Sequence, residues 1–317
     1  MSRILLTAIG SMAAAPVARR YQALGHTVFG CDIYPREWTA LAGELEFFQA
    51  RLATEGEPYV EQLREAVRRD MLDFLIPLTD PEVDALAPRK AEFRALGCTV
   101  CVPEERVAAL CRRKDTMNRF LAEKRVCRLI PTESAVSGQP CPFPFPAMVK
   151  PRSGRSSLGQ AVAADEKSYQ TTLAGREDCI VQPFLEGDIF CVDVARDAFG
   201  HTRAAARQEL LRNKSGLGMT VEVLPGHPLE AVCAAIAEAV GLVGVVNMEF
   251  IRHGDDFFFL EVNPRFSGGV GFSMATGMDF AEMMLCCHSC GSVEAFPAAP
   301  KHALLARESN IVLTQLR

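Results

Sequence analysis

Two acids and two amides in the segment 245–263 have the spacing of a metal-binding hairpin. The turn signal His-Gly-Asp-Asp at 253–256 separates two strand-like runs. A turn centred on Asp255 would place four polar side chains on one face, in two facing pairs, because strand side chains alternate. The pairs are Glu249 with Glu261 and Asn247 with Asn263. The other face is expected to be an apolar floor of Met248, Phe250, Phe258, Leu260 and Val262.

Two carboxylates that face each other across a hairpin repel and should attract a cation. Carboxylate and amide oxygens suit Mg²⁺, which takes one or two protein carboxylates together with phosphate oxygens. The alternative is an exposed hairpin face whose charges are simply solvated. Because the amides alternate in step with Glu249 and Glu261, and Pro264-Arg265 follows at once, the pattern favours a metal site.

A Gly/Ser/Arg loop follows the strand that ends at Lys150. Backbone N–H groups of such a loop can cradle phosphate, and Lys150 and Arg155 can add positive charge. The glycines of 154–159 fit a Walker A loop, but Gln160 and Ala161 replace its Lys and Ser/Thr, so a P-loop is rejected. An ordinary flexible loop remains the alternative here, and a solvated helix-face charge remains the alternative for Lys114.

The order of these motifs is more specific than any one of them. Lys114-Asp115 is followed by Met-Val-Lys-Pro at 148–151, Val-Gln-Pro-Phe-Leu-Glu-Gly at 181–187, Asn-Met-Glu at 247–249 and Glu-Val-Asn-Pro-Arg at 261–265. Over nearly the whole chain this resembles the ATP-grasp superfamily, within it the carbamoyl-phosphate-synthase-like carboxylate–amine ligases. The resemblance implies an α/β fold: a Rossmann-like pre-ATP-grasp domain (1–103), then an ATP-grasp fold of two α+β subdomains, one small with a linking helix (104–185) and one large that carries the metal site (186–317).

The resemblance also assigns roles to individual residues. Lys114 and Lys150 match lysines that hold ATP phosphates, and Arg265 matches the arginine that steadies the γ-phosphate and the acyl-phosphate. Arg207 is a weaker match to a basic residue near the substrate. The matched lid residues are Ser153, Gly154, Arg155 and Ser156; the adenine hinge is Gln182, Pro183, Phe184 and Leu185; Asp188 or Glu186 would meet the ribose; and Glu249, Glu261 and Asn263 would bind Mg²⁺, with two ions expected and Mn²⁺ as the alternative.

The implied reaction is ATP-dependent formation of an amide or peptide-like bond through an acyl-phosphate. The expected partners are a small carboxylate and a small amine, amino acids among them. Carbamoyl-phosphate-synthase-like phosphorylation of carboxyphosphate or carbamate is the alternative reaction, and a non-catalytic nucleotide-binding regulator is the alternative class. A nicotinamide oxidoreductase is disfavoured because Met12 and Ala15 replace the later glycines of a dinucleotide-binding turn.

The elements that must position these residues begin with a βαβ unit. Strand 3–9, a turn at Gly10, helix 12–24 and strand 26–33 predict a parallel sheet, and helix 59–69, strand 72–78, helix 81–96 and strand 98–102 extend it. A single helix is expected over 104–124, and a Pro-rich connector over 137–146. A polar loop is expected over 211–219, and a helix over 229–240 precedes the hairpin.

Composition limits the class of protein. The 317 residues suggest about two domains. A net charge of −5 gives no sign of a nucleic-acid or anionic-membrane surface, and no apolar stretch reads as a membrane span. Twelve scattered cysteines without an apparent export signal predict a reduced, cytoplasmic protein. Zinc at Cys98 and Cys101 is disfavoured, because residues three apart in a strand point to opposite faces. The oligomeric state is left open, with a homodimer as one option.

Overall fold

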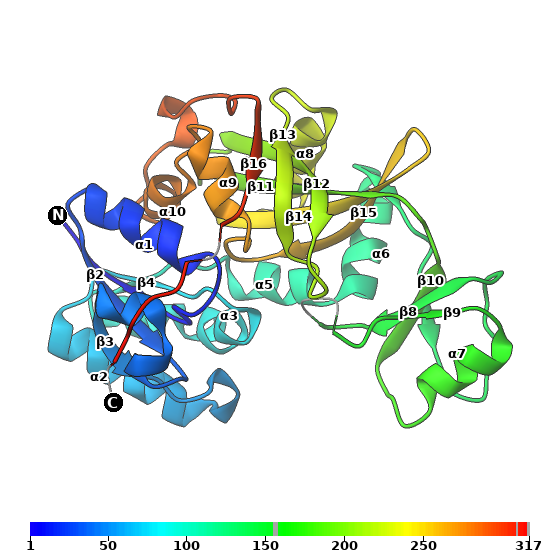
Figure 1. Ribbon diagram of the computed structural model, residues 1–317, viewed down its shortest axis with the longest axis horizontal. Coiled ribbons are helices and arrows are strands. Elements are labelled where there is room, and N and C mark those ends of the chain that lie inside the picture. Colours follow the sequence, from blue (N-terminus) through cyan, green and yellow to red (C-terminus); the bar gives the residue numbers. More distant parts are fainter. Residues whose placement is uncertain (155–157, 309, 316–317) are drawn as a thin grey trace.

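The computed structural model describes residues 1–154, 158–308 and 310–315, and these fold around three β-sheets. Figure 1 shows the N-terminal sheet and the small sheet at opposite ends of the molecule, with the large sheet between them. Each sheet belongs to a nearly continuous stretch of chain, apart from one short strand of the large sheet.

The N-terminal sheet is parallel, with strand order β3-β2-β1-β4-β5. Its strands are β1 (Arg3–Leu6), β2 (Thr27–Asp32), β3 (Glu46–Gln49), β4 (Phe74–Ile76) and β5 (Thr99–Val100), and its helices are α1 (Ala14–Ala23), α2 (Glu57–Asp70), α3 (Asp80–Leu86) and α4 (Lys90–Ala95). Apolar clusters cover the sheet on two sides. The predicted doubly wound α/β fold is therefore confirmed, although β3 had not been predicted.

Two predicted helices are interrupted in the structure. The helix expected over 81–96 divides into α3, a 3₁₀ turn at Ala87–Arg89 and α4, and Pro88, which lacks an N–H, lies at the break. The helix expected over 104–124 divides into α5 (Glu105–Arg112) and α6 (Lys114–Lys124), because Arg113 is extended with φ −109° and ψ 102°. The second break makes Lys114 the first residue of a helix.

The small sheet is antiparallel, with order β7-β10-β8-β9. It consists of β7 (Glu133–Ala135), β8 (Ala147–Pro151), β9 (Ala161–Ala163) and β10 (Cys179–Pro183), and α7 (Glu166–Leu173) packs against it. Tyr169 and Leu173 of this helix join Val149 and Val181 in a separate apolar core. This small body can therefore hold Lys150 at the end of β8 on a packed support.

The large sheet has order β16-β13-β12-β11-β14-β15-β6. Its strands are β6 (Arg128–Leu129), β11 (Asp188–Arg196), β12 (Thr202–Arg212), β13 (Gly218–Val223), β14 (Gly244–His253), β15 (Asp256–Asn263) and β16 (Ala303–Ala306). The helices α8 (Pro228–Val240), α9 (Val270–Ala275) and α10 (Phe280–His288) accompany it. Strands β12 and β13 were not predicted, and they shorten the expected polar loop to residues 213–217.

The hairpin of β14 and β15 has the predicted pairing at its functional end. Asn247 faces Asn263 and Glu249 faces Glu261, but a bulge follows, because Phe250 pairs with Phe259 and Leu260 is the extra residue. The apolar floor was therefore predicted wrongly in part. Phe259 is buried in the core beside Phe250, whereas Phe258 and Leu260 are only partly buried. A bulge changes which face the following residues point to, and nothing in the sequence marks it.

Every helix within the described ranges is too short or too polar to cross a lipid bilayer.

The bulge can be tested by stability. Phe259→Ala should lower the free energy of unfolding by about 3–5 kcal/mol, the usual cost of emptying a buried phenylalanine site. Phe258→Ala, one residue away but partly exposed, should cost much less. Urea unfolding monitored by circular dichroism compares the two variants. An equal loss, or a larger loss at Phe258, would contradict the bulged register.

Candidate active site

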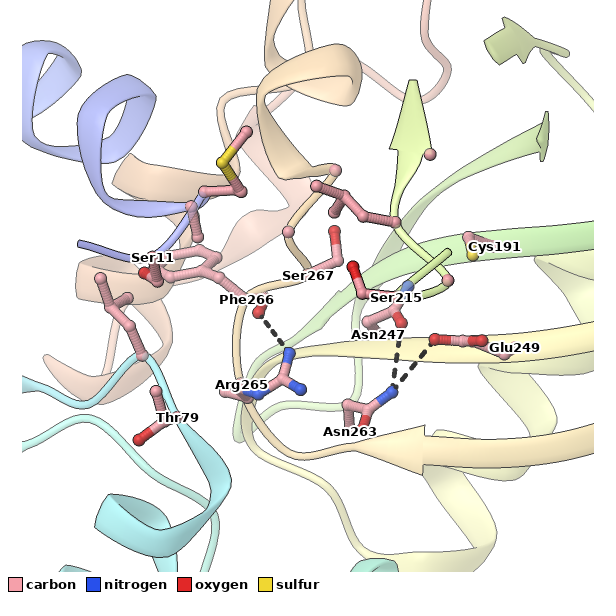
Figure 2. A pocket seen from close by; sticks show the side chains of 18 of the residues that line it. Ser11, Thr79, Cys191, Ser215, Asn247, Glu249, Asn263, Arg265, Phe266 and Ser267 are labelled. Atoms are coloured by element: carbon pink, nitrogen blue, oxygen red, sulfur yellow. Dashed lines mark hydrogen bonds between the residues drawn. The ribbon is translucent and has the colours of Figure 1, made fainter. Parts of the chain in front are cut away.

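The two facing pairs converge on a single amide. The Nδ2 atom of Asn263 lies 3.3 Å from Oε1 of Glu249 and 3.3 Å from Oε1 of Glu261, and 3.4 Å from Oδ1 of Asn247. Figure 2 shows Asn263, Asn247 and Glu249 pointing toward one another from the adjacent strands β14 and β15. The Nδ2 atom of Asn247 is buried and has no hydrogen-bond partner among the residues that the structure describes. The quartet is thus an oxygen-rich cluster that the protein alone leaves incompletely satisfied.

Two lysines from different parts of the chain approach these acids. Lys114, at the start of α6, places its Nζ 3.0 Å from Oε2 of Glu261. Its backbone N–H donates to the carbonyl of Arg152, which ties the helix start to the end of β8. Lys150 lies on β8 and pairs with Ile180 of β10. Both ammonium groups are buried, with 7% and 5% of the residue exposed.

The surroundings shift the pKa values of these buried acids and lysines in different directions. Burial, with the nearby charge of Glu261, raises the pKa of Glu249 to about 7. Burial also acts to raise the pKa of Glu261, but Lys114 and Lys150 outweigh it, so the net shift is downward. Burial, helped by repulsion from Lys114, lowers the pKa of Lys150 to about 8 despite Glu261. The two carboxylates therefore differ: one is held ionised by lysines, and the other resists ionisation.

A cavity of about 350 Å³ lies between the small and large sheets, next to this cluster. The cavity is lined by the predicted adenine hinge, Gln182, Pro183, Phe184 and Leu185, and also by Lys150, Ile130, Met148, Ile251 and Leu260. The side chain of Gln182 is occupied, since its Nε2 donates to Thr132 over 2.6 Å. The cavity is therefore lined by apolar side chains, by the chain segment at the end of β10, and by the two carboxylates.

The remaining predicted nucleotide contacts are less well placed. Asp188 does not line the cavity, and its carboxylate pairs with Arg252, whereas Glu186 does line it. Ser153 is exposed, and Gly154 is near the site only through its carbonyl, which accepts from Nζ of Lys114 at 3.4 Å. The other two predicted lid residues, Arg155 and Ser156, lie outside the described residues.

A second cavity, of about 270 Å³, lies between the N-terminal domain and the large sheet. It shares Glu249, Glu261, Ser215 and Gly216 with the first cavity. Figure 2 shows Ser11 and Thr79 on its N-terminal side, and Arg265, Asn263 and Ser267 on its other side. The two cavities meet at the carboxylates, so molecules bound in each could react there.

Arg207 and Arg265 both line this second cavity, but they differ in how tightly neighbouring side chains hold them. Arg207 is 1% exposed, and its Nη1 lies 2.6 Å from Oδ2 of Asp193 while its Nη2 donates to Ser267 over 3.1 Å. A side chain at Gly269 would collide with this guanidinium, its Cβ falling 2.7 Å from Nη2. Arg207 is therefore built into the wall by fixed partners. Arg265 is more open, and Asp80 of the N-terminal domain holds it.

Several residues that line the two cavities were not predicted from the sequence, among them Asp80, Glu209, Arg212 and Leu260. Arg212 bridges two acids, with its Nε 2.8 Å from Glu209 and its Nη2 3.8 Å from Glu249. Glu209 is nearly covered, with 4% of its side chain exposed. Arg212 could have been suspected from its place at the polar loop, but Asp80 and Glu209 depend on contacts between distant segments, which the sequence alone does not show.

A metal site at the quartet could not be made of acids, histidines or thiols alone, because two of its four side chains are amides. Within the described ranges, no three His, Cys, Asp or Glu side chains gather in a geometry that could hold a metal ion. Cys98 and Cys101 flank β5 and are buried in different apolar clusters, consistent with opposite faces of the sheet. A cation at the quartet would thus rely on two carboxylates and amide oxygen, which a turn of the Asn263 amide would present.

Comparisons with known proteins concern the family and the fold of the chain. Residues 175–310 match a family described as ATP-grasp in the biosynthetic pathway with Ter operon. The formate-dependent phosphoribosylglycinamide formyltransferase of Solidesulfovibrio magneticus is 26% identical in an alignment of length 287 that covers 83% of this chain and 69% of the relative. The chain spans only 66% and 55% of the relatives of the same name from Synechococcus and Pseudomonas savastanoi.

Two solved structures share the fold over almost the whole chain. A biotin carboxylase from Campylobacter jejuni superposes with a TM-score of 0.73 at 16% identity, covering 95% of this chain and 74% of that one. The N5-carboxyaminoimidazole ribonucleotide synthetase of Thermus thermophilus gives a TM-score of 0.73 at 16% identity, covering 96% and 82%. At these identities the likeness concerns the fold alone.

The unequal carboxylates predict opposite effects of two matched substitutions. Glu249→Gln should raise the melting temperature in a metal-free buffer at about pH 8. The folded-state pKa of Glu249 is raised from 4.5 to about 7, so its ionisation costs stability as the pH rises between these values, and the full cost is present at pH 8. Glu261→Gln should lower the melting temperature, because the lysines lose the charge that stabilises them. The gain for Glu249→Gln should shrink at about pH 5, where the folded protein already holds that proton.

Thermal unfolding followed by circular dichroism, with EDTA present, measures both effects. Shifts of the same sign for the two variants would contradict the assigned difference between the carboxylates.

Proposed function

Because the chain belongs to the ATP-grasp superfamily, we propose that it is an ATP-dependent carboxylate–amine ligase that works through an acyl-phosphate. The observation that carries this proposal is the position of the facing pair Glu249 and Glu261, at the junction of two cavities. One cavity has the walls expected for a nucleotide, and the other opens toward the N-terminal domain. Phosphoryl transfer between their occupants would then take place beside the carboxylates and lysines.

In this proposal the nucleotide lies in the cavity between the small and large sheets. Ile251 and Leu260 would contact the base on the large-sheet side, and the chain at Gln182–Leu185 would run along its edge. Lys114 and Lys150 would hold the phosphates. Glu186 is better placed than Asp188 for the ribose, because it lines the cavity and Asp188 is paired with Arg252. The lid residues 153–156 keep their proposed role over the phosphates.

The quartet fits Mg²⁺ on its own chemistry. It offers two carboxylates and amide oxygen, a hard-oxygen set of the kind that Mg²⁺ prefers. The Nδ2 atom of Asn247 has no acceptor among the described residues, and a phosphate oxygen held by the ion could supply one. Glu249, Glu261 and Asn263 would be the ligands. When bound, the ion would neutralise charge on the transferred phosphoryl group. We propose two ions, with Mn²⁺ able to replace Mg²⁺.

The chain's own residues would mainly position and neutralise. The substrate carboxylate attacks the γ-phosphorus of ATP and forms an acyl-phosphate, and ADP departs. Lys114, Lys150 and Arg265 would stabilise the negative charge on the oxygens in transit. An uncharged amine then attacks the acyl carbon and phosphate leaves. The walls of the second cavity would orient the acid and amine and limit the access of water.

The relatives suggest candidates for the acid and the amine. The relatives are named for formate-dependent formyl transfer to a phosphoribosyl amine, which makes formate one acid to test. The chain does not cover the full length of those relatives, so their substrates do not transfer directly. Amino acids remain candidates for either substrate. Carbamate or carboxyphosphate chemistry is retained as the alternative reaction.

We also propose that the protein works in the cytoplasm. All twelve cysteines are free thiols in the structure, as expected for a reducing compartment. A homodimer is proposed as one assembly state, and light scattering after gel filtration would decide it. Neither nucleic acid nor a membrane is part of the proposed reaction.

A screen of ADP release tests the proposed function. Formate, bicarbonate and each amino acid would be supplied as the acid, with hydroxylamine as a small generic amine that converts an acyl-phosphate into a detectable hydroxamate. Acid-dependent release of ADP with hydroxamate formation supports the ligase. Bicarbonate-dependent ADP release without a stable hydroxamate would favour the carboxyphosphate alternative. Nucleotide binding without turnover under any condition would favour a regulator and contradict the proposal.

Glu261→Gln should slow ADP release by at least about a hundredfold. The substitution removes a proposed metal ligand and the ion-pair partner of Lys114. Glu222→Gln is a suitable control, because Glu222 lies on the same sheet but pairs with His302 at the surface. A folded Glu261→Gln variant with wild-type turnover would contradict the metal assignment.

Nucleotide binding should take up a proton through Lys150. At about pH 8.5 this lysine is largely neutral in the free protein, and nearby phosphates favour its charged form. Affinity for Mg²⁺-free ATP should therefore fall as the pH rises above about 8. Calorimetry in buffers of different ionisation enthalpy measures the uptake. Lys150→Arg, always charged, should bind without that uptake; an unchanged uptake in this variant would assign the proton to another group.

A further inference from the structure

The guanidinium of Arg265 is held from outside its own sheet. Its Nη2 lies 3.1 Å from Oδ2 of Asp80, and its Nη1 donates to the carbonyl of Phe266 over 2.9 Å. Asp80 belongs to the N-terminal domain, 185 residues earlier in the chain, and is 0% exposed. A charge-assisted bond between a largely buried loop arginine and a fully buried carboxylate is directional and strong.

The sequence around Asp80 fixes the carboxylate in place. Asp80 is the first residue of α3, and Pro81 follows, which favours the start of a helix. Glu82 reaches back over the helix start: its Oε2 accepts from Thr79 Oγ1 at 2.7 Å and from the Thr79 N–H at 3.0 Å. Glu82 is itself buried beneath this turn. The Thr-Asp-Pro-Glu segment is therefore a rigid mount for the side chain of Asp80.

The other oxygen of Asp80 has no comparable partner. Its Oδ1 accepts no hydrogen bond from the described part of the chain and lies 3.9 Å from Nη1 of Arg112. Arg112 is held elsewhere, since its Nε donates to Asp84 over 3.0 Å. Arg265 is thus the principal cation of a carboxylate that would be costly to bury unpaired. The pair is needed by both members, and it joins the N-terminal domain to the loop after the metal-ligand strand β15.

We propose that Asp80 is a positioning residue: through its bond to Arg265, the N-terminal domain sets the direction in which that arginine meets the γ-phosphate. The inference rests on the proposed function, because it takes Arg265 to contact the γ-phosphate. It gives the N-terminal domain a part in phosphoryl transfer beyond forming a wall of the second cavity. Asp80 does this without touching the nucleotide, since it is fully covered and does not line the nucleotide cavity.

The test compares affinity for nucleotides with and without a γ-phosphate, and so needs no knowledge of the acid or amine. Calorimetry in Mg²⁺ would give dissociation constants for ADP and for the non-hydrolysable analogue AMPPNP. The full-length protein should prefer AMPPNP. Asp80→Asn should reduce that preference about tenfold, the lower end of the effect of removing a partner that orients a site residue, and should leave ADP affinity unchanged.

Two further variants separate positioning from folding. Glu65→Gln removes a charge from the exposed face of α2, in the same domain, and should keep the wild-type preference. Asp80→Asn introduced into an Arg265→Lys background should have almost no further effect, because the pair acts as one unit. Circular dichroism would confirm that each variant is folded.

Unchanged preference in Asp80→Asn, or an equal loss in the Arg265→Lys background, would overturn the positioning role while leaving nucleotide binding and the proposed function intact. A wild-type protein that binds AMPPNP no better than ADP would remove Arg265 from the γ-phosphate and overturn the inference. Failure to bind either nucleotide would instead contradict the proposed function.

Discussion

The organising constraint of this protein is the placement of two carboxylates directly across a hairpin, largely away from water. Glu249 and Glu261 repel each other, and the fold tolerates them because Lys114 and Lys150 come within reach from two other parts of the chain. The compensation is one-sided, since it lowers the pKa of Glu261 and leaves that of Glu249 raised. The two carboxylates therefore lack a further positive charge nearby. A divalent cation bound together with a polyphosphate would supply that charge.

Each body of the structure contributes one component to this point. The large sheet supplies the acids and amides, the small sheet supplies Lys150, and the break at Arg113 supplies Lys114 at the start of α6. The N-terminal domain supplies Asp80, which holds Arg265. An ATP-grasp enzyme needs such a junction because phosphoryl transfer depends on positioning more than on covalent chemistry by the protein. Moving any body relative to the others would change the reactive geometry.

Much of the fold and the centre of the site could be predicted from local pattern. The pairing of Glu249 with Glu261 follows from strand alternation, and the parallel N-terminal sheet follows from the βαβ order. The bulge at Leu260, the break at Arg113 and the strand β12 could not, because packing decides them and no turn residue announces them. Asp188 looked suitable for the ribose, but it pairs with Arg252 on the neighbouring strand β14, which is distant in sequence. The domain boundaries and site roles remain predictions.

Anomalous scattering from crystals grown with AMPPNP and Mn²⁺ would test directly whether the facing carboxylates bind a metal ion. Mn²⁺ is easily located in this way, and it prefers oxygen ligands, as Mg²⁺ does. We expect an anomalous peak bounded by the side-chain oxygens of Glu249, Glu261 and Asn263, with nucleotide phosphate on its other side. A bound nucleotide whose phosphates and metal lie away from these three residues would contradict it.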